Sequence, residues 1–317
     1  MIEVEGLTKD YGPRRAIHNL TFNANPGEIL GFLGPNGAGK TTTMRILTGF
    51  MPPTMGNARV CGFDVVEESL EVRKRVGYLP ETVPLYPDMT VFEYLKYMAD
   101  LRHIKNVEDR VDDVLEIVHL EERANGYISN LSKGMRQRLG LAQALVHEPD
   151  VLILDEPTIG LDPAQIREVR TLIREIGKRR TVLLSTHILS EAQQICDRVL
   201  IINKGEIVVE DTPTHLQAGL AGAQRISIRV QGDGDGLEKL VGELSGIGDV
   251  ITIQEGLIEA ECAPGKEVRP EIARKLITAG FDLLEMKSID LSLEDIFIQL
   301  TRDEPEPPST DDSVEES

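Results

Sequence analysis

A glycine-rich segment between residues 34 and 41 has the composition of a phosphate-binding loop. Its sequence, Gly34-Pro35-Asn36-Gly37-Ala38-Gly39-Lys40-Thr41, fits the spacing G-x-x-x-x-G-K-[ST]. Glycines let the backbone wrap around a phosphate chain with its N–H groups turned inward. We expect Lys40 to reach the β- and γ-phosphates and the Thr41 hydroxyl to ligate Mg²⁺. Alone, the motif indicates only a nucleoside triphosphate.

Two acidic residues and a histidine follow apolar strands further along the chain. Asp155 and Glu156 end the run "VLILDE", and His187 ends "TVLLSTH". Ligands of open α/β sheets gather at the carboxyl ends of the strands. Asp155 is then suited to the water shell of Mg²⁺, Glu156 to deprotonating an attacking water, and His187 to holding the transferred phosphoryl group. Without the glycine loop, solvated acids and a structural histidine would be the simpler interpretation.

A second helix start with free backbone N–H groups occurs at "LSKGMRQRLGLAQAL", residues 131–145. The Ser132 hydroxyl and the Gly134 N–H could hold an anion there, although an ordinary N-capped helix fits the same residues. Tyr11 precedes the glycine loop on an expected turn, where its ring could stack on adenine or simply pack.

These residues need a sheet that brings strand ends together. Apolar runs at 28–33, 151–155, 181–186 and 198–203 predict buried parallel strands, with helices at 40–50 and 163–178. The glycine loop lies between the first strand and the first helix, as a phosphate loop must. Helical periodicity between about 88 and 147 predicts a helical subdomain inserted into this α/β fold.

The pattern changes near residue 220. Residues 219–224 are expected to be a linker, and 225–302 to form a separate α+β domain. Strands and helices in the order βαββαβ indicate a ferredoxin-like split pattern. A closing helix is expected at 292–301, and the acidic segment 303–317 is expected to be disordered.

Composition restricts the classes of function. The chain has 317 residues and a net charge of −19, and no basic region of the kind that nucleic-acid binders show is present. No apolar run reaches the roughly 20 residues needed to span a bilayer, and the first residues do not resemble a signal peptide. The three cysteines are far apart in sequence, which favours reduced thiols in a cytosolic protein.

Taken together and in this order, the motifs over residues 1–218 resemble the ATP-binding subunit of an ABC transporter. The resemblance assigns an A-loop at Tyr11, a Walker A motif at 34–41, a Walker B motif at 151–155, a D-loop at 160–162 and a switch histidine at His187. It identifies residues 131–135 as the family signature. It implies that ATP and Mg²⁺ are the cofactors, with Thr42 and Asp162 added to the nucleotide-binding residues and Glu81 to the metal ligands.

The resemblance also explains the second helix start. In the family, two subunits pair head to tail, and each ATP lies between the Walker A motif of one and the signature of the other. One helix N-terminus supplies only about half a positive charge, so a second one completes the enclosure of the γ-phosphate. The implied partners are a second copy or a homologous ATPase subunit, and a membrane permease that docks near residues 81–101. The same residues could instead be core of the helical subdomain. The implied location is cytoplasmic, at the inner face of the cell membrane.

Two positions depart from the usual family pattern. The signature reads Leu131-Ser132-Lys133-Gly134-Met135 where LSGGQ is common, and Glu81 stands where most members have a glutamine. Both departures, and the ending "SLEDIFIQLT", resemble exporters of drugs and polysaccharides. We therefore expect an exporting ATPase with altered kinetics.

Two alternatives remain open at this stage. One is a non-transport ATPase of the same family that acts on ribosomes or DNA, which the acidity and the single cassette disfavour. The other concerns residues 225–302, which could sense a ligand; a domain that stabilises the dimer is the simpler interpretation.

Overall fold

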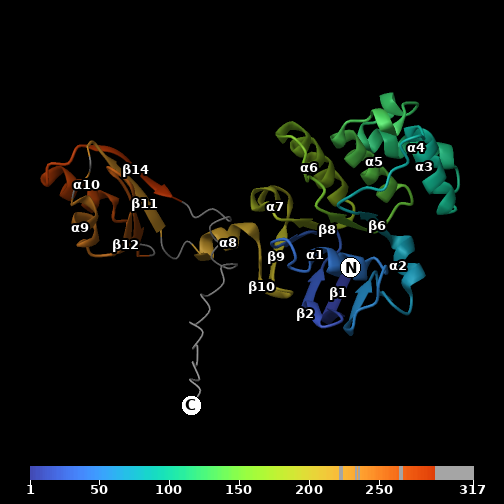
Figure 1. The fold of residues 1–317 in the computed structure, drawn as a ribbon, viewed down its shortest axis with the longest axis horizontal. Helices are drawn as coiled ribbons and strands as arrows, with labels where there is room; N and C mark the ends of the chain where they lie inside the picture. The colour runs from blue at the N-terminus through green and yellow to red at the C-terminus, as the bar shows by residue number, and fades with distance from the viewer. Residues whose placement is uncertain (221–223, 233, 235, 264–266, 290–317) are drawn as a thin grey trace, which may run out of the picture. The chain divides into compact units, whose positions relative to one another are not determined.

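The computed structural model describes residues 1–220, 224–232, 234, 236–263 and 267–289 (Figure 1). They fall into two compact units, Met1–Pro213 and Thr214–Ser317. Each unit has its own hydrophobic core, and each is treated separately below. No helix in the described part of the chain has both the length and the apolar character needed to cross a bilayer.

The larger unit is built around a six-stranded sheet of order β10-β9-β3-β8-β7-β6. Its strands are β3 (Ile29–Leu33), β6 (Val76–Leu79), β7 (Val151–Asp155), β8 (Thr181–Thr186), β9 (Arg198–Asn203) and β10 (Glu206–Asp211). All neighbours are parallel except the β9–β10 hairpin. Every residue of β3, β7 and β8 is buried, because such strands are covered on both faces. The expected parallel sheet is confirmed.

An antiparallel sheet at the N-terminus was not anticipated from the sequence. It has the order β2-β1-β4-β5 and consists of β1 (Ile2–Tyr11), β2 (Arg14–Ala24), β4 (Met55–Val60) and β5 (Phe63–Asp64). Its buried residues share one core with β3 and with the helix after the glycine loop. Several register shifts interrupt the β1–β2 pairing, so the side-chain alternation that would reveal these strands is broken.

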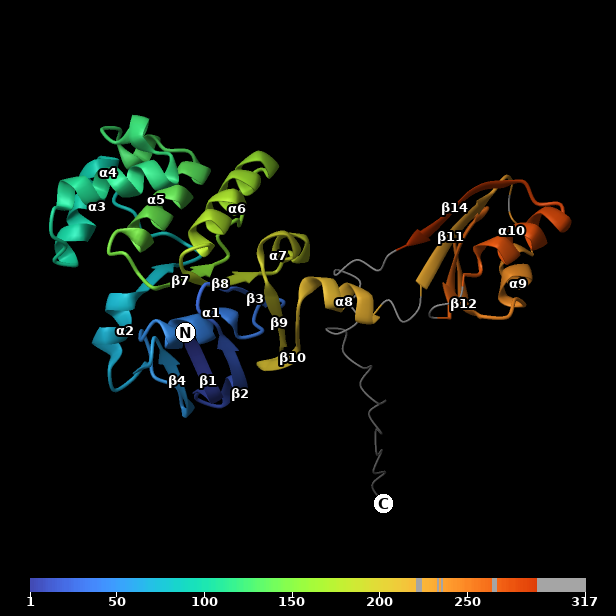
Figure 2. The same ribbon diagram turned by 180° about the vertical axis from the view of Figure 1, so that it is seen from behind.

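Helices cover the central sheet and form the expected subdomain. Those connected directly to the sheet are α1 (Lys40–Leu47), α2 (Ser69–Arg75), α6 (Pro163–Gly177) and α7 (Leu189–Ile195). The subdomain consists of α3 (Val91–Leu101), α4 (Val107–Val118), α5 (Lys133–Leu145) and the 3₁₀ turns η1 (Glu121–Arg123) and η2 (Ile128–Asn130). Both views show α3, α4 and α5 gathered together, away from β1 and β2 (Figure 2).

The smaller unit contains β11 (Gln224–Val230), α9 (Leu237–Gly242), β12 (Ile247–Gln254), β13 (Leu257–Cys262), α10 (Arg269–Thr278) and β14 (Leu283–Ile289). The sheet order is β12-β13-β11-β14, and all pairs are antiparallel. This order of elements and strands is the ferredoxin-like pattern.

The segment expected to link the two domains is shorter than the sequence suggested. Helix α8 runs over Pro213–Leu220, so it passes the boundary expected at residue 218, and β11 already begins at Gln224. Proline at the first helical position favours a helix that begins at Pro213, and the helix formers Leu216, Gln217 and Ala218 favour its continuation. The helix expected at 292–301 and the tail at 303–317 lie outside the described residues.

Candidate nucleotide site

Three neighbouring strands of the central sheet bring the expected functional residues together. Leu33 at the end of β3 pairs with Thr186 of β8, and Asp155 at the end of β7 pairs with Ser185. The strands are parallel, so the segments that follow them emerge at the same edge. The glycine loop, His187 and Glu156 therefore meet at one place, as the sequence predicted.

The glycine loop adopts backbone conformations that explain two of its glycines. Gly37 and Gly39 have φ values of +82° and +110°, a region that favours glycine. A β-carbon on Gly39 would also lie 2.8 Å from the carbonyl oxygen of Ala16. Gly39 is the N-cap of α1, and no side chain caps the N–H groups of the first turn of this helix. The start of α1 is thus a site for an anion.

Lys40 is buried within this loop. Its side chain is 6% exposed, and its ammonium donates to the carbonyl of Gly34 at 2.7 Å and that of Pro35 at 3.3 Å. It also lies 3.3 Å from Glu156 Oε1. Buried ammonium groups require such partners because their desolvation is costly.

Glu156 occupies a strained position directly after β7. Its φ is +50°, which is uncommon for a residue with a side chain. The surrounding contacts hold it there: its N–H donates to Ser185 Oγ at 2.9 Å, and its Oε2 lies 2.8 Å from His187 Nδ1. Strain of this kind is often found at functional sites. The fixed carboxylate faces the glycine loop.

Asp155 presents a carboxylate oxygen that the described part of the chain leaves without a hydrogen bond. The residue is 1% exposed; Ser185 Oγ donates to its Oδ1 at 2.6 Å, whereas its Oδ2 has no partner. Burial and the nearby charge of Asp155 raise the pKa of Tyr78 to about 12. An orphaned buried oxygen beside a phosphate loop fits a divalent cation. Thr41 and Glu81 are available as further ligands, since both line the adjoining cavity.

That cavity has a volume of about 660 Å³ and contains most of the expected site. Its lining includes eleven predicted residues, namely Tyr11, Pro35, Asn36, Gly37, Gly39, Lys40, Thr41, Thr42, Glu81, Glu156 and His187. Tyr11 ends β1 and has 45% of its surface exposed, with its hydroxyl 3.1 Å from Met51 Sδ. The ring is therefore accessible at the mouth of the cavity.

Sequence reasoning missed several residues here. Arg14, Ala16 and Ile159 also line the cavity, and Ser185 bridges Asp155 to the backbone of Glu156. Arg14 belongs to the unforeseen hairpin of β1 and β2, so no motif indicated it. The serine before "TH" could have been noted as the residue paired with Asp155.

Six expected residues are absent from this lining, one of which is Asp155, described above. Gly34 and Ala38 are buried within the loop. Ser132 caps α5 by accepting from the Met135 N–H at 3.3 Å, and Asp162 caps α6 by accepting from Ala164 and Gln165. Gly134 is covered by the Gln165 side chain. The signature residues thus lie outside the cavity that their own chain forms.

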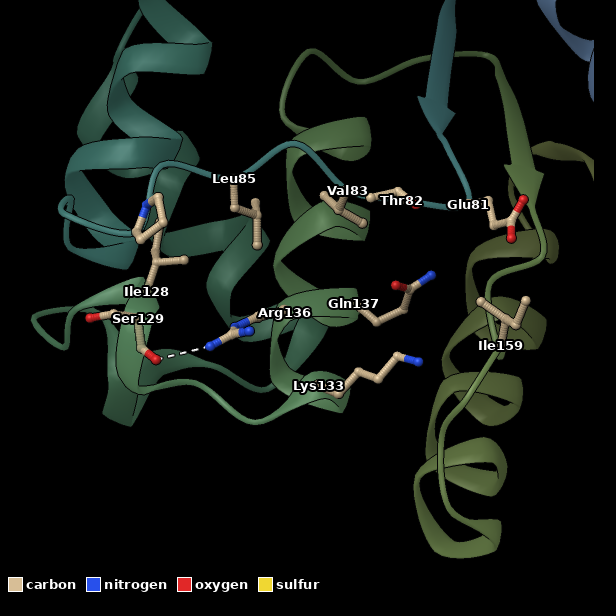
Figure 3. A pocket seen from close by; sticks show the side chains of 11 residues that line it. Glu81, Thr82, Val83, Leu85, Ile128, Ser129, Lys133, Arg136, Gln137 and Ile159 are labelled. Atoms are coloured by element: carbon tan, nitrogen blue, oxygen red, sulfur yellow. Dashed lines mark hydrogen bonds between the residues drawn. The ribbon is translucent and has the colours of Figure 1, made fainter.

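A second cavity of about 530 Å³ adjoins α5 (Figure 3). Glu81 and Ile159 line both cavities. Gln137, which is 7% exposed, points into the second one, and within the described residues its amide nitrogen has no acceptor. Lys133 and Arg136 also face it, and Arg136 donates to the Ser129 carbonyl at 2.9 Å.

Comparisons with known proteins identify the family. The model of the ABC transporter family matches residues 17–159. The chain is 38% identical over 303 residues to the uncharacterized ABC transporter ATP-binding protein YdbJ of Bacillus subtilis, with 95% of each chain covered. It is 37% identical to the bacitracin transport ATP-binding protein BcrA of Bacillus licheniformis, in an alignment that covers 95% of this chain and 97% of BcrA.

Solved structures agree with this assignment. An ATP-binding subunit of an ABC transporter is 31% identical, has a TM-score of 0.63, and covers 70% of this chain and 93% of its own. A dimeric bacterial ABC transporter cassette, MJ0796, is 25% identical with a TM-score of 0.62, and covers 67% of this chain and 98% of its own. The chain belongs to the ABC transporter family, as an ATP-binding subunit that hydrolyses ATP.

Proposed function

We propose that two copies of this chain, or one copy and a homologous subunit, close around Mg-ATP and drive a separate membrane permease. The observation that carries the proposal is the division of the site. Lys40, Glu156 and His187 converge in one cavity, whereas Ser132 and Gly134 lie outside it. A nucleotide held by the glycine loop leaves the signature of its own chain free to serve another copy.

Four residues of the cavity have a chemical task in this proposal. Glu156 is the general base, since its fixed carboxylate can take the proton of the attacking water. Lys40 leaves its carbonyl partners to neutralise the β- and γ-phosphates. His187 orients Glu156 through their 2.8 Å contact and donates to the transferred phosphoryl group. Tyr11 stacks on adenine.

The metal site proposed here uses Thr41, Asp155 and Glu81. Mg²⁺ is commonly bound by one or two carboxylates together with phosphate oxygens, and the unpaired Oδ2 of Asp155 supplies the buried carboxylate. When bound, the ion neutralises charge that develops on the phosphate oxygens. The carboxylate of Glu81 adds negative charge where the family usually has a neutral amide, so it favours a site occupied by Mg²⁺.

The partner copy completes the enclosure from its side. Ser132 and Gly134 stand at the N-terminus of α5, and Asp162 at that of α6. The positive end of α5 is suited to the γ-phosphate of a facing copy. Because that contact needs the γ-phosphate, ATP favours the dimer and hydrolysis weakens it.

The surface that meets the permease is proposed to lie between residues 81 and 101. In this segment Tyr94 and Leu95 are buried in the subdomain core, whereas Tyr86, Tyr97 and Leu101 are 49%, 41% and 57% exposed. Part of the segment is thus core, and its exposed aromatic side chains remain for a partner, as is typical of interfaces. BcrA is named for bacitracin transport, and by similarity we propose export by a complex at the inner face of the cell membrane.

Sedimentation of the Glu156→Gln variant tests the dimer. With Mg-ATP we expect the mass of two chains, and with Mg-ADP the mass of one. A variant that binds ATP and keeps the mass of one chain at all protein concentrations would contradict the proposal. Pull-down of the permease from detergent-solubilised membranes would then test docking. We expect Tyr97→Ser to weaken the association of this chain with the permease. Val208→Ser, which changes an exposed residue of β10, is the control.

A further inference from the structure

A buried hydrogen bond joins the loop of residues 156–162, which connects β7 to α6, to the first turn of α7. Thr158 Oγ1 donates to Glu191 Oε2 at 2.5 Å, and the two residues are only 2% and 4% exposed. Glutamate is almost never buried to this extent unless it is paired. Neither residue has a task in the proposed hydrolysis of ATP, although both lie close to residues that do.

The environment of Glu191 makes this hydrogen bond costly to break. Burial raises the pKa of the Glu191 carboxyl, and the Thr158 hydroxyl opposes this shift because it donates to the ionised form. The charge of Arg170, on α6, also lowers this pKa, whereas that of Glu156 raises it. A buried carboxylate that loses its donor would be left without compensation, so the pair is a firm link between the 156–162 loop and α7.

Two other contacts hold Glu156 itself. Its N–H donates to Ser185 Oγ at 2.9 Å, and its Oε2 lies 2.8 Å from His187 Nδ1. The His187 side chain is 42% exposed, so water can compete for the second contact. Neither contact reaches the chain that follows Glu156. The φ of +50° at this residue persists only where the surroundings hold the backbone firmly.

The chain that follows Glu156 is a tight turn with Thr158 at its centre. The N–H of Ile159 donates to the Glu156 carbonyl at 3.2 Å and closes the turn. The N–H of Leu161 donates to the Thr158 carbonyl, also at 3.2 Å. Because Thr158 is only two residues from Glu156, an anchor on its side chain fixes the direction in which the backbone leaves Glu156.

We propose that Glu191 is a positioning residue for ATP hydrolysis, which holds Thr158 and thereby keeps the Glu156 carboxylate directed at the attacking water. The inference rests on the proposed function, in which Glu156 is the general base. Glu191 is not among the residues that line the nucleotide cavity, so it acts through the loop and not on the nucleotide. The segment that begins at Ser185 thus holds Glu156 at its N–H, at its side chain and at the turn that follows it.

Loss of this anchor should impair the chemical step more than nucleotide binding. A misplacement of about 1 Å in a reacting group can cost about 100-fold in rate. We therefore expect Glu191→Leu and Thr158→Val to lower kcat by about 10- to 100-fold and to change KM for ATP by less than about threefold. Glu191→Gln keeps an oxygen that accepts from Thr158, so its kcat should recover to within about threefold of the parental value.

A double-mutant cycle on kcat tests whether the two residues act through their hydrogen bond. The variant that combines Thr158→Val with Glu191→Leu should lose no more activity than either single variant, because all three lack the same bond. Thr181→Val is the matched control. It removes a buried hydroxyl at the start of β8, where Thr181 Oγ1 donates to the Asn25 carbonyl at 2.9 Å. This control should lose stability in urea denaturation and keep the parental kcat.

Three results would overturn the inference: parental kcat in folded Glu191→Leu or Thr158→Val, additive losses in the double variant, or a loss in Glu191→Gln as large as that in Glu191→Leu. If Glu191→Leu does not fold, Thr158→Val and Glu191→Gln carry the test. Glu156→Gln is measured alongside. Parental turnover in Glu156→Gln would remove the general base from the proposed function. An inactive Glu156→Gln beside fully active Thr158→Val would refute the positioning role alone.

Discussion

The ammonium of Lys40 lies 3.3 Å from Glu156 Oε1, and both side chains are less than a tenth exposed. Each of these buried charges therefore compensates the other. The residue expected to bind phosphate and the residue expected to act as base are thus adjacent before any reaction. A γ-phosphate that attracts Lys40 would separate the Glu156 carboxylate from this buried counter-ion.

Glu156→Gln is expected to lower kcat for ATP hydrolysis by about 100-fold or more, because removal of a general base typically costs this much. The amide keeps the shape of the side chain, so the chain should still bind ATP. Steady-state phosphate release measures the effect, with Glu175→Gln on the exposed side of α6 as control. Parental turnover in Glu156→Gln would show that another group is the base.

Ser185→Ala is expected to destabilise the fold by about 1–3 kcal/mol, since it leaves buried polar groups without partners. Its hydroxyl accepts from the Glu156 N–H and donates to Asp155, so kcat should fall as well. Urea denaturation measures the stability. Ser190→Ala, at an exposed position, should change it by less than about 0.5 kcal/mol. Equal free energies of unfolding for the two variants would contradict the bridging role of Ser185.

Asp155→Asn is expected to raise the Mg²⁺ concentration needed for half-maximal ATPase activity by about tenfold or more. The buried Oδ2 would then lack the charge that attracts the cation. Magnesium titrations at saturating ATP measure the shift, and exposed Asp150→Asn provides the control. A magnesium requirement that does not change would place the cation elsewhere.

The stability of the chain is expected to decrease as the pH falls from about 6.5 to about 4, in part because of His147. Burial and nearby arginines lower the pKa of this histidine from 6.5 to about 4. In that window the unfolded chain binds a proton that the folded chain does not, so the free energy of unfolding rises with pH. His147 contributes up to about 3 kcal/mol to this change.

Urea titrations at pH 7 and pH 5 measure this contribution. The Nε2 of His147 lies 3.0 Å from the Val76 carbonyl. The His147→Gln variant keeps a hydrogen-bond donor there but has no group that titrates in this pH range. That variant should lose less stability between the two pH values than the parent. His103→Asn, which changes an exposed histidine, should lose as much as the parent. Equal losses in all three proteins would contradict the assignment.

Much of the site could be predicted from the sequence because it depends on short-range order. The glycine loop, Asp155, Glu156 and His187 each follow a continuous apolar run, and parallel strands carry their following residues to one edge. The N-terminal sheet could not be predicted in this way. Register shifts between β1 and β2 disturb the alternation of buried and exposed side chains along these strands. Because the two strands were not predicted, the position of Arg14 in the cavity was not predicted either.

Other features depend on contacts that sequence spacing does not reveal. The bridge from Ser185 to Asp155 and Glu156 depends on the order of β7 and β8 in the sheet. The approach of Lys133 to Gly160 joins the start of α5 to the loop between β7 and α6. The sequence did show that Lys133 departs from the usual signature, but only the packing of α5 beside the 156–162 loop showed which group it meets.

Crosslinking between copies tests the central claim most directly. One Glu156→Gln protein carries Ser132→Cys and another carries Asn36→Cys, each with Cys61 replaced by Ser. Asn36 is exposed in the glycine loop and lines the nucleotide cavity. We predict a disulfide-linked pair only when the two proteins are mixed, and only with Mg-ATP. No linked pair under these conditions, or an equal yield without nucleotide, would contradict a nucleotide enclosed jointly by two copies.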